Sequence, residues 1–103
     1  MPSEITARKF QVVRVIDGDT FSVLYDGEET SVRIANYDAP EPNQPGGAEA
    51  TAKLAALIAG KRVRLEFPEK RKRDHFGRLL CDVKVGPIDV GTEMSRKPDH
   101  GSP

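Results

Sequence analysis

Residues 20–34 read TFSVLYDGEETSVRI, and this stretch decides the fold. Apolar and polar residues alternate on both sides of Asp26-Gly27, a pair that tolerates the positive φ angles of a two-residue hairpin turn. A turn at this place pairs Thr20 with Arg33 and puts the apolar side chains of both strands on one face. The stretch therefore predicts a β-hairpin with one buried face.

Further apolar segments flank this hairpin on both sides. Together with it they predict five strands, at residues 8–16, 20–25, 29–36, 61–67 and 78–85. Apolar residues spaced three and four apart predict a helix over residues 48–59. Five short antiparallel strands with a helix after the third indicate a mainly β (α+β) fold, a five-stranded Greek-key barrel of the OB type. We expect one domain over residues 8–90, with residues 1–7 and 91–103 as flexible tails.

Charge is balanced over the whole chain but not along it. Sixteen Lys and Arg residues match sixteen Asp and Glu residues, yet residues 61–78 carry eight basic residues against three acidic ones. Within that segment, residues 70–73 are expected to form a solvated loop, with a nuclear targeting signal as the less favoured reading. The single cysteine, Cys81, excludes an internal disulfide and is expected in the core. No apolar run predicts a signal peptide or a membrane span, which leaves a secreted or a cytoplasmic protein open.

Two acidic segments and two arginines stand out as candidates for chemistry. Asp17-Gly18-Asp19 places carboxylates at a bend, and Asp38-Ala39-Pro40-Glu41 places two more beyond the third strand. Oxygen ligands of this kind suit Ca²⁺ or Mg²⁺. Arg33 and Arg78 offer planar forks that can grip phosphate oxygens. A cation, a positioned water and phosphate donors are the parts that phosphodiester cleavage needs.

The direction of the Asp19 side chain raises a geometric problem. In a regular pleat Asp19 would face the core while Arg33 faces away from it. A bulge or twist near Gly18 is therefore expected to redirect the carboxylate, and glycine is the residue type that would permit it.

Three motifs in this order, spread around the predicted helix, resemble the staphylococcal nuclease (thermonuclease) family. They are Val-Ile-Asp-Gly-Asp-Thr at 15–20 with Arg33 after it, Asp-Ala-Pro-Glu at 38–41, and Asp-His-Phe-Gly-Arg at 74–78. The similarity runs from about Phe10 to Val90. It implies an OB-type barrel that acts as a Ca²⁺-dependent nuclease on single-stranded DNA or RNA.

The resemblance also implies a role for each site residue. Asp19, Asp38 and the backbone carbonyl of Ala39 would bind Ca²⁺. Glu41 would orient or deprotonate the attacking water. Arg33 and Arg78 would bind the scissile phosphate and stabilise the transition state, and the products would carry a 5′-hydroxyl and a 3′-phosphate.

The chain departs from the family pattern at two places. Phe76 stands where the family often has tyrosine, so a hydroxyl that could touch a terminal phosphate is missing. Beyond Val85 family members usually continue into further helices, whereas residues 91–103 contain only Met94 as a large apolar side chain. We therefore expect an uncovered apolar face, through which the chain could form a homo-oligomer.

Other interpretations of the same residues remain open at this stage. Asp17, Gly18 and Asp19 could simply form a turn, with Asp17 in a structural role. Arg78 could pair with Asp74 on the surface. The main alternative function is a non-catalytic OB-type module that binds nucleic acid or a protein. Such a module is expected to have lost the acidic and arginine positions. All five of them are present in this chain, so a metal-dependent phosphodiesterase is favoured.

Overall fold

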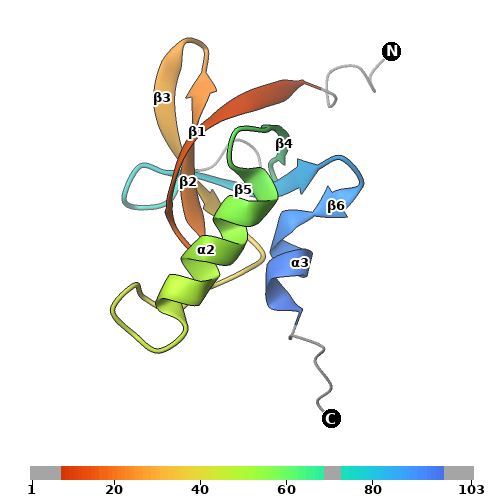
Figure 1. Cartoon of the computed structure of the whole chain (residues 1–103). Coiled ribbons are helices and arrows are strands. Elements are labelled where there is room, and N and C mark those ends of the chain that lie inside the picture. Colours follow the sequence, from red (N-terminus) through yellow and green to blue (C-terminus); the bar gives the residue numbers. More distant parts are fainter. Residues whose placement is uncertain (1–7, 69–72, 97–103) are drawn as a thin grey trace.

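The computed structural model describes residues 8–68 and 73–96. Helices and strands follow one another along the chain (Figure 1): β1 Lys9–Asp17, β2 Thr20–Tyr25, β3 Glu28–Ile34, α2 Gly47–Ile58, β4 Arg62–Glu66, β5 Leu79–Val85, β6 Ile88–Asp89 and α3 Val90–Ser95. Neither helix in these ranges has the length and apolar character needed to cross a membrane.

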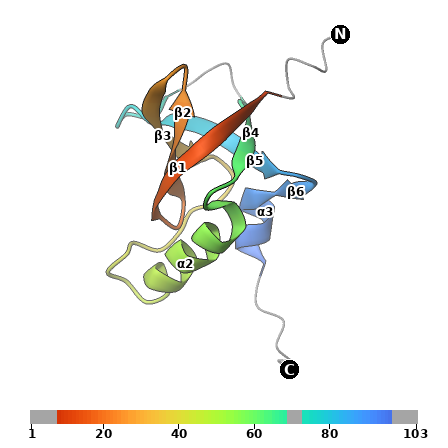
Figure 2. The ribbon, with the colours of Figure 1, turned by 45° about the horizontal axis from the view of Figure 1, so that its top comes forward.

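The strands form a closed barrel. They are ordered β3-β2-β1-β4-β5-β6, and a further pairing between β3 and β5 closes the first five of them on one another. Figure 2 shows β1 crossing this barrel obliquely from the N-terminal side. The predicted five-stranded barrel with a helix after the third strand is thus confirmed. The expectation that all strands are antiparallel is wrong at one place, because β5 pairs with β3 in parallel. A crossover through α2 and β4 joins these two strands, and parallel pairing requires a connection of this kind.

The hairpin forms with the predicted register. Thr20 lies opposite Arg33, and Asp26 and Gly27 in the turn have φ angles of 53° and 86°. The side chains on its inner face are fully buried: Phe21, Val23, Val32 and Ile34. Alternation along two strands joined by a tight turn therefore fixes which residues enter the core.

Helix α2 packs an apolar stripe against the strands. Ala50, Leu54 and Ile58 are buried at successive spacings of four residues, and the left-handed Gly60 follows the helix. Cys81 lies fully buried in β5, as expected of a core residue. The helix thus covers an opening of the barrel through which the apolar interior would otherwise meet water.

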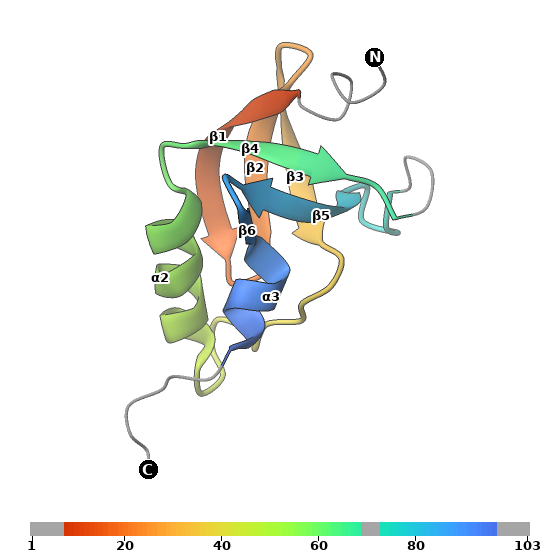
Figure 3. The same cartoon turned by 90° about the vertical axis from the view of Figure 1, so that its right-hand side faces the viewer.

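Residues 91–95 are not part of an irregular tail. They belong to α3, and Asp89, the N-cap residue just before it, accepts a hydrogen bond from the Thr92 amide at 3.0 Å. Val90 and Met94 lie four residues apart and are buried, and α3 contacts α2 and β5 beside it (Figure 3). The prediction missed this helix because two apolar residues within six positions give no readable periodicity. The other expected irregular segments, residues 1–7, 70–72 and 97–103, lie outside the described residues.

Candidate active site

An irregularity at the end of β1 sets the direction of Asp19. The pairing of β1 with β2 shifts register between Val15 and Asp17, just before the position where a bulge was predicted. Asp19 is 8% exposed, and its Oδ2 accepts a hydrogen bond from the Ala39 amide at 2.9 Å. Asp17 Oδ1 in turn accepts from the Asp19 amide at 3.1 Å, which is the structural role expected of it. The bend therefore holds the Asp19 carboxylate against the loop after β3.

Gly18 is required for space rather than for backbone freedom. Its φ angle is not positive, so the expected conformational role is not observed. A Cβ atom at this position would lie 2.6 Å from Ala50 Cβ and 2.7 Å from Ala39 Cβ. The bend, the loop after β3 and helix α2 thus meet at three small residues.

Replacing Gly18 by alanine is expected to lower the free energy of unfolding by about 1–3 kcal/mol, the usual cost of overpacking. Urea denaturation measures this change. The double variant Gly18→Ala/Ala50→Gly removes one of the two clashes, so its loss should be smaller than the sum of the single losses. Strict additivity would contradict the packing explanation.

Arg33 brings two carboxylates together. Its Nη2 lies 2.9 Å from Asp38 Oδ1 and 3.5 Å from Asp19 Oδ2. Its Nη1 donates to the carbonyls of Ile34 and Tyr37, which fixes the guanidinium against the end of β3. The Asp38 side chain is 89% exposed and that of Asp19 only 11%, so one carboxylate is anchored and the other is open to solvent.

Arg78 enters the same site from the start of β5. Its Nε lies 2.7 Å from Asp74 Oδ2, so the pairing with Asp74 considered from the sequence does occur, although both side chains are partly buried. Its Nη1 also donates to Thr20 Oγ1 at 3.1 Å, and the Thr20 hydroxyl donates to Asp19 Oδ1 at 2.9 Å. A chain of hydrogen bonds therefore joins Arg78 to Asp19. Sequence analysis gave no role to Thr20, although its predicted position opposite Arg33 was the signal that could have found it.

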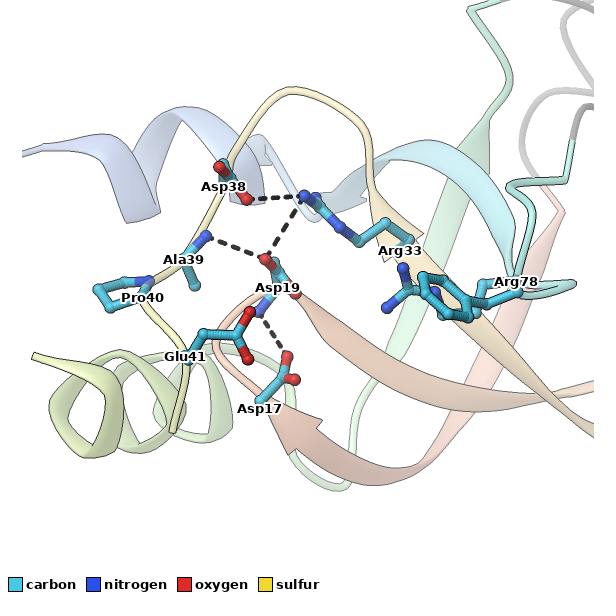
Figure 4. A pocket seen from close by; sticks show the side chains of 9 residues that line it. Asp17, Asp19, Arg33, Asp38, Ala39, Pro40, Glu41 and Arg78 are labelled. Atoms are coloured by element: carbon cyan, nitrogen blue, oxygen red, sulfur yellow. Dashed lines mark hydrogen bonds and ion pairs between the residues drawn. The ribbon is translucent and has the colours of Figure 1, made fainter. Parts of the chain in front are cut away.

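Glu41 lines the same cleft, and the described residues leave its carboxylate unengaged. Its backbone is fixed by Gln44, because the Glu41 amide donates to Gln44 Oε1 at 3.0 Å and its carbonyl accepts from the Gln44 amide at 2.9 Å. Within residues 8–68 and 73–96, no hydrogen bond or ion pair engages the Glu41 carboxylate. Figure 4 shows this carboxylate turned toward Asp17 and Asp19.

All six site residues predicted from the sequence meet around one cleft of about 300 Å³ (Figure 4). Its lining consists of Asp17, Asp19, Arg33, Asp38, Ala39, Pro40, Glu41, Phe76 and Arg78. Phe76 is 71% exposed, with the Arg78 guanidinium carbon 5.0 Å from its ring centroid. The cleft thus combines carboxylates, two guanidinium groups and an exposed aromatic ring.

The pKa values of the neighbouring Asp17 and Asp19 are shifted in opposite directions. Burial acts to raise the pKa of Asp19, but the Ala39 amide, the adjacent Asp17 and Thr20 groups and the charge of Arg33 together bring it below its usual value. Burial raises the pKa of Asp17, and the Asp19 charge adds to this effect against the hydrogen bond from the Asp19 amide. Asp19 is therefore the member of the pair that favours the ionised form.

The donor chemistry of the cleft fits a hard cation. The Asp19 and Asp38 carboxylates already share one positively charged nitrogen of Arg33, so they converge on a point where positive charge is favourable. In the described part of the chain, no three Asp, Glu, His or Cys side chains form a metal-binding group by themselves. A metal held here would need backbone carbonyl and water oxygens as well, and Ca²⁺ accepts such mixed ligands.

Several known proteins are similar to this chain over most of its length. The thermonuclease of Staphylococcus hyicus is 37% identical over 90 residues, which cover 82% of this chain and 53% of that protein. The thermonuclease of Staphylococcus intermedius is 34% identical over 101 residues, 92% of this chain and 60% of that protein. The chain belongs to the staphylococcal nuclease-like family. Another similar protein is endonuclease YncB of Bacillus subtilis, 41% identical over 78 residues, 70% of this chain and 37% of that protein.

The similarity to these thermonucleases covers only part of their length. The chain spans about half the length of the curated thermonucleases it matches, and no family model matches it. The barrel with its helix after β3 and the order of the three motifs are what a staphylococcal nuclease-like domain is expected to have.

Proposed function

We propose that this domain is a nuclease, a hydrolase that cleaves phosphodiester bonds of single-stranded DNA or RNA with Ca²⁺ as its cofactor. The observation that carries the proposal is the convergence of Asp19, Asp38, Arg33 and Arg78 in one open cleft beside the Glu41 carboxylate, which none of the described residues engages. The printed names of the relatives, thermonuclease and endonuclease, support the same reaction class.

Asp19, Asp38 and the backbone carbonyl of Ala39 would hold the Ca²⁺ ion. When bound, the ion supplies positive charge that neutralises a phosphate oxygen as the reaction proceeds. Asp19 is suited to this task because its pKa is lowered and its carboxylate is fixed from three sides, by Ala39, Thr20 and Arg33. Asp38 is suited to it because the side chain is open to solvent and can adjust to an arriving ion.

The two arginines would hold the scissile phosphate. Arg78 uses Nε for Asp74 and Nη1 for Thr20, and no hydrogen bond from the described residues occupies Nη2. This nitrogen is therefore preorganised to donate to a phosphate oxygen. Arg33 Nη2 now donates to Asp38, and an incoming phosphate would compete for that hydrogen bond. Donors fixed before the charge develops stabilise a transition state without a cost of reorganisation.

Glu41 would position the attacking water. Its carboxylate is free to accept a hydrogen bond from water, and its backbone is held by Gln44, so the acceptor sits on a defined loop. Attack of the water oxygen on phosphorus would break the P–O5′ bond and leave a 3′-phosphate. The water proton would go to Glu41 or to solvent, and the leaving O5′ would take up a proton from solvent to become the 5′-hydroxyl.

Cleavage of end-labelled single-stranded DNA, with RNA in parallel, tests the proposal directly. With Ca²⁺ present, we expect fragments that carry 3′-phosphates, and excess chelator should stop their formation. A non-catalytic OB-type module would instead bind the strand and release no fragments under either condition.

Replacing Asp19 by asparagine is expected to weaken Ca²⁺ binding and to raise the Ca²⁺ concentration needed for cleavage, because one anionic ligand is lost. Calorimetric titration with Ca²⁺ measures the binding separately from activity. Asp26→Asn, in the distant hairpin turn, is the matched control and should bind Ca²⁺ as the parent does. Unchanged cleavage by Asp19→Asn at low Ca²⁺ would place the metal elsewhere.

Self-association through an exposed apolar face remains a prediction, separate from the proposed nuclease activity. Helix α3 covers part of the surface that was expected to be bare, since Val90 and Met94 are buried. Large apolar side chains that are exposed in the described ranges are Val13, Ile16, Leu24, Phe76 and Ile88. Sedimentation equilibrium over a range of protein concentrations tests whether the chain forms dimers.

A further inference from the structure

A second, smaller groove lies on the outer wall of the barrel, apart from the acidic cleft. It has a volume of about 180 Å³ and is lined by Lys9, Arg62, Arg64, Lys84 and Gly86. These residues come from β1, β4 and the end of β5, the wall seen in Figure 3, and none of them lines the cleft around Asp19. Four of the five lining residues are positively charged, and none is acidic.

The register of the sheet places these cations directly beside one another. Lys9 lies opposite Arg64 in the pairing of β1 with β4, and Arg64 lies opposite Lys84 in the pairing of β4 with β5. Three positive side chains therefore form a row across three strands, and Arg62 adds a fourth on the same face of β4. Like charges placed opposite one another destabilise a sheet, so this row has an energetic cost in the free protein.

Acidic neighbours offset only part of this charge. Lys84 lies 2.8 Å from Asp89 and 3.9 Å from Glu66, and the charge of Asp82 also acts on it, so three carboxylates offset this one member of the row. Arg64 Nη2 donates to the Gly86 carbonyl at 3.0 Å, a contact that orients the guanidinium, and no carboxylate within residues 8–68 and 73–96 pairs with its charge. Lys9 and Arg62 are exposed, and their side chains have no acidic partner among the residues that the structure describes.

We propose that this groove binds the phosphate backbone of a nucleic acid at a site separate from the catalytic cleft. Guanidinium and ammonium groups are the usual phosphate contacts, and the groove has no aromatic side chain on which a base could stack. Binding there is therefore independent of sequence and dominated by charge. The choice of nucleic acid over other polyanions rests on the proposed function.

The groove and the catalytic cleft lie toward opposite ends of β5. Arg78 precedes the strand and Gly86 follows it, and seven residues of strand span roughly 20 Å. A single-stranded nucleic acid several nucleotides long could therefore be bound at the groove through one part while another part occupies the cleft. This arrangement favours long substrates over short ones.

Binding of a labelled oligothymidylate of about twenty nucleotides, followed by fluorescence anisotropy in excess chelator, tests the groove without cleavage. The double variant Lys9→Gln/Arg62→Gln should bind about tenfold more weakly at low salt. The slope of log affinity against log salt concentration should become shallower by about 1.4, since each phosphate contact to a single strand contributes about 0.7. Lys9→Arg/Arg62→Lys keeps both charges and should keep the slope.

The matched control removes the same net charge elsewhere on the surface. Arg14 pairs with Glu29, and Lys53 donates to the Arg96 carbonyl, so neither lines the groove. Arg14→Gln/Lys53→Gln should leave the salt slope nearly unchanged. Equal losses in both double variants, or an unchanged slope in the groove variant, would overturn the proposal. A chain that shows groove-dependent binding in chelator but never cleaves would refute the proposed nuclease function and leave the groove standing.

Discussion

Replacing Arg78 by lysine is expected to lower kcat by about 10²-fold or more and to leave the fold intact, a loss on the scale of removing one preorganised transition-state donor. The reason is geometric. Arg78 donates from Nε to Asp74 and from Nη1 to Thr20. Its side chain also lines the cleft, where no described residue accepts a hydrogen bond from Nη2. A lysine ammonium is a single point of charge, so it cannot hold both partners and still present a fixed donor to phosphate.

Steady-state kinetics on single-stranded DNA at saturating Ca²⁺ measures this loss, with thermal melting as the test of folding. Arg73→Lys is the matched control, because Arg73 lies nearby, is exposed and donates to the Gly77 carbonyl without lining the cleft. Its kcat should change little. If Arg78→Lys raised KM and kept kcat, Arg78 would bind substrate without stabilising the transition state.

Local patterns in the sequence were enough to predict the strands and the central register. The pairing of Thr20 with Arg33 follows from a two-residue turn at Asp26-Gly27, because both positions accept a positive φ angle and the side chains alternate with a period of two. Asp19 and Arg33 could be brought near each other on the same reasoning, since the bend before β2 and the end of β3 must then be neighbours. These features depend on residues close together in the chain.

Contacts between distant segments could not be predicted in the same way. The parallel pairing of β3 with β5 depends on how the barrel closes after α2 and β4, and no local pattern specifies it. The direction of Asp19 depends on the Ala39 amide, twenty residues later, and on the space that Gly18 leaves. The double role of Arg78, bound to Asp74 and Thr20 at once, likewise appears only when the strands are placed in three dimensions.

Helix α3 shows why the end of the domain was mispredicted. Its stability comes from tertiary contacts rather than from its own sequence, because six residues are too few to form an isolated helix. Asp89 caps the helix and also accepts a hydrogen bond from Asn36 Nδ2 at 3.1 Å. The packing is close, since a Cβ atom on Gly91 would overlap the side-chain carbonyl oxygen of Asn36. The start of the helix is therefore held, through Asn36, against the loop that leads to Asp38.

Replacing Met94 by alanine is expected to lower the free energy of unfolding by about 2–5 kcal/mol. Met94 is 5% exposed and belongs to the same core cluster as Val90, so truncation removes apolar contacts and leaves a cavity. A small domain has a total stability of about 5–15 kcal/mol, and this single change could remove a large share of it. Because α3 also holds Asn36, we expect the loop that carries Asp38 to lose order as the helix detaches.

Urea denaturation, with the midpoint and slope analysed separately, measures the effect of Met94→Ala. Met94→Leu keeps nearly the same volume and should cost less than about 1.5 kcal/mol, which separates loss of packing from loss of methionine itself. Ile88→Ala is the second control, because this nearby apolar side chain is 37% exposed and leaves a smaller cavity when it is removed. If Met94→Ala and Ile88→Ala reduced stability equally, or if deletion of the chain beyond Val90 changed nothing, α3 would not be part of the core. The barrel and α2 would then bury their apolar surface without it.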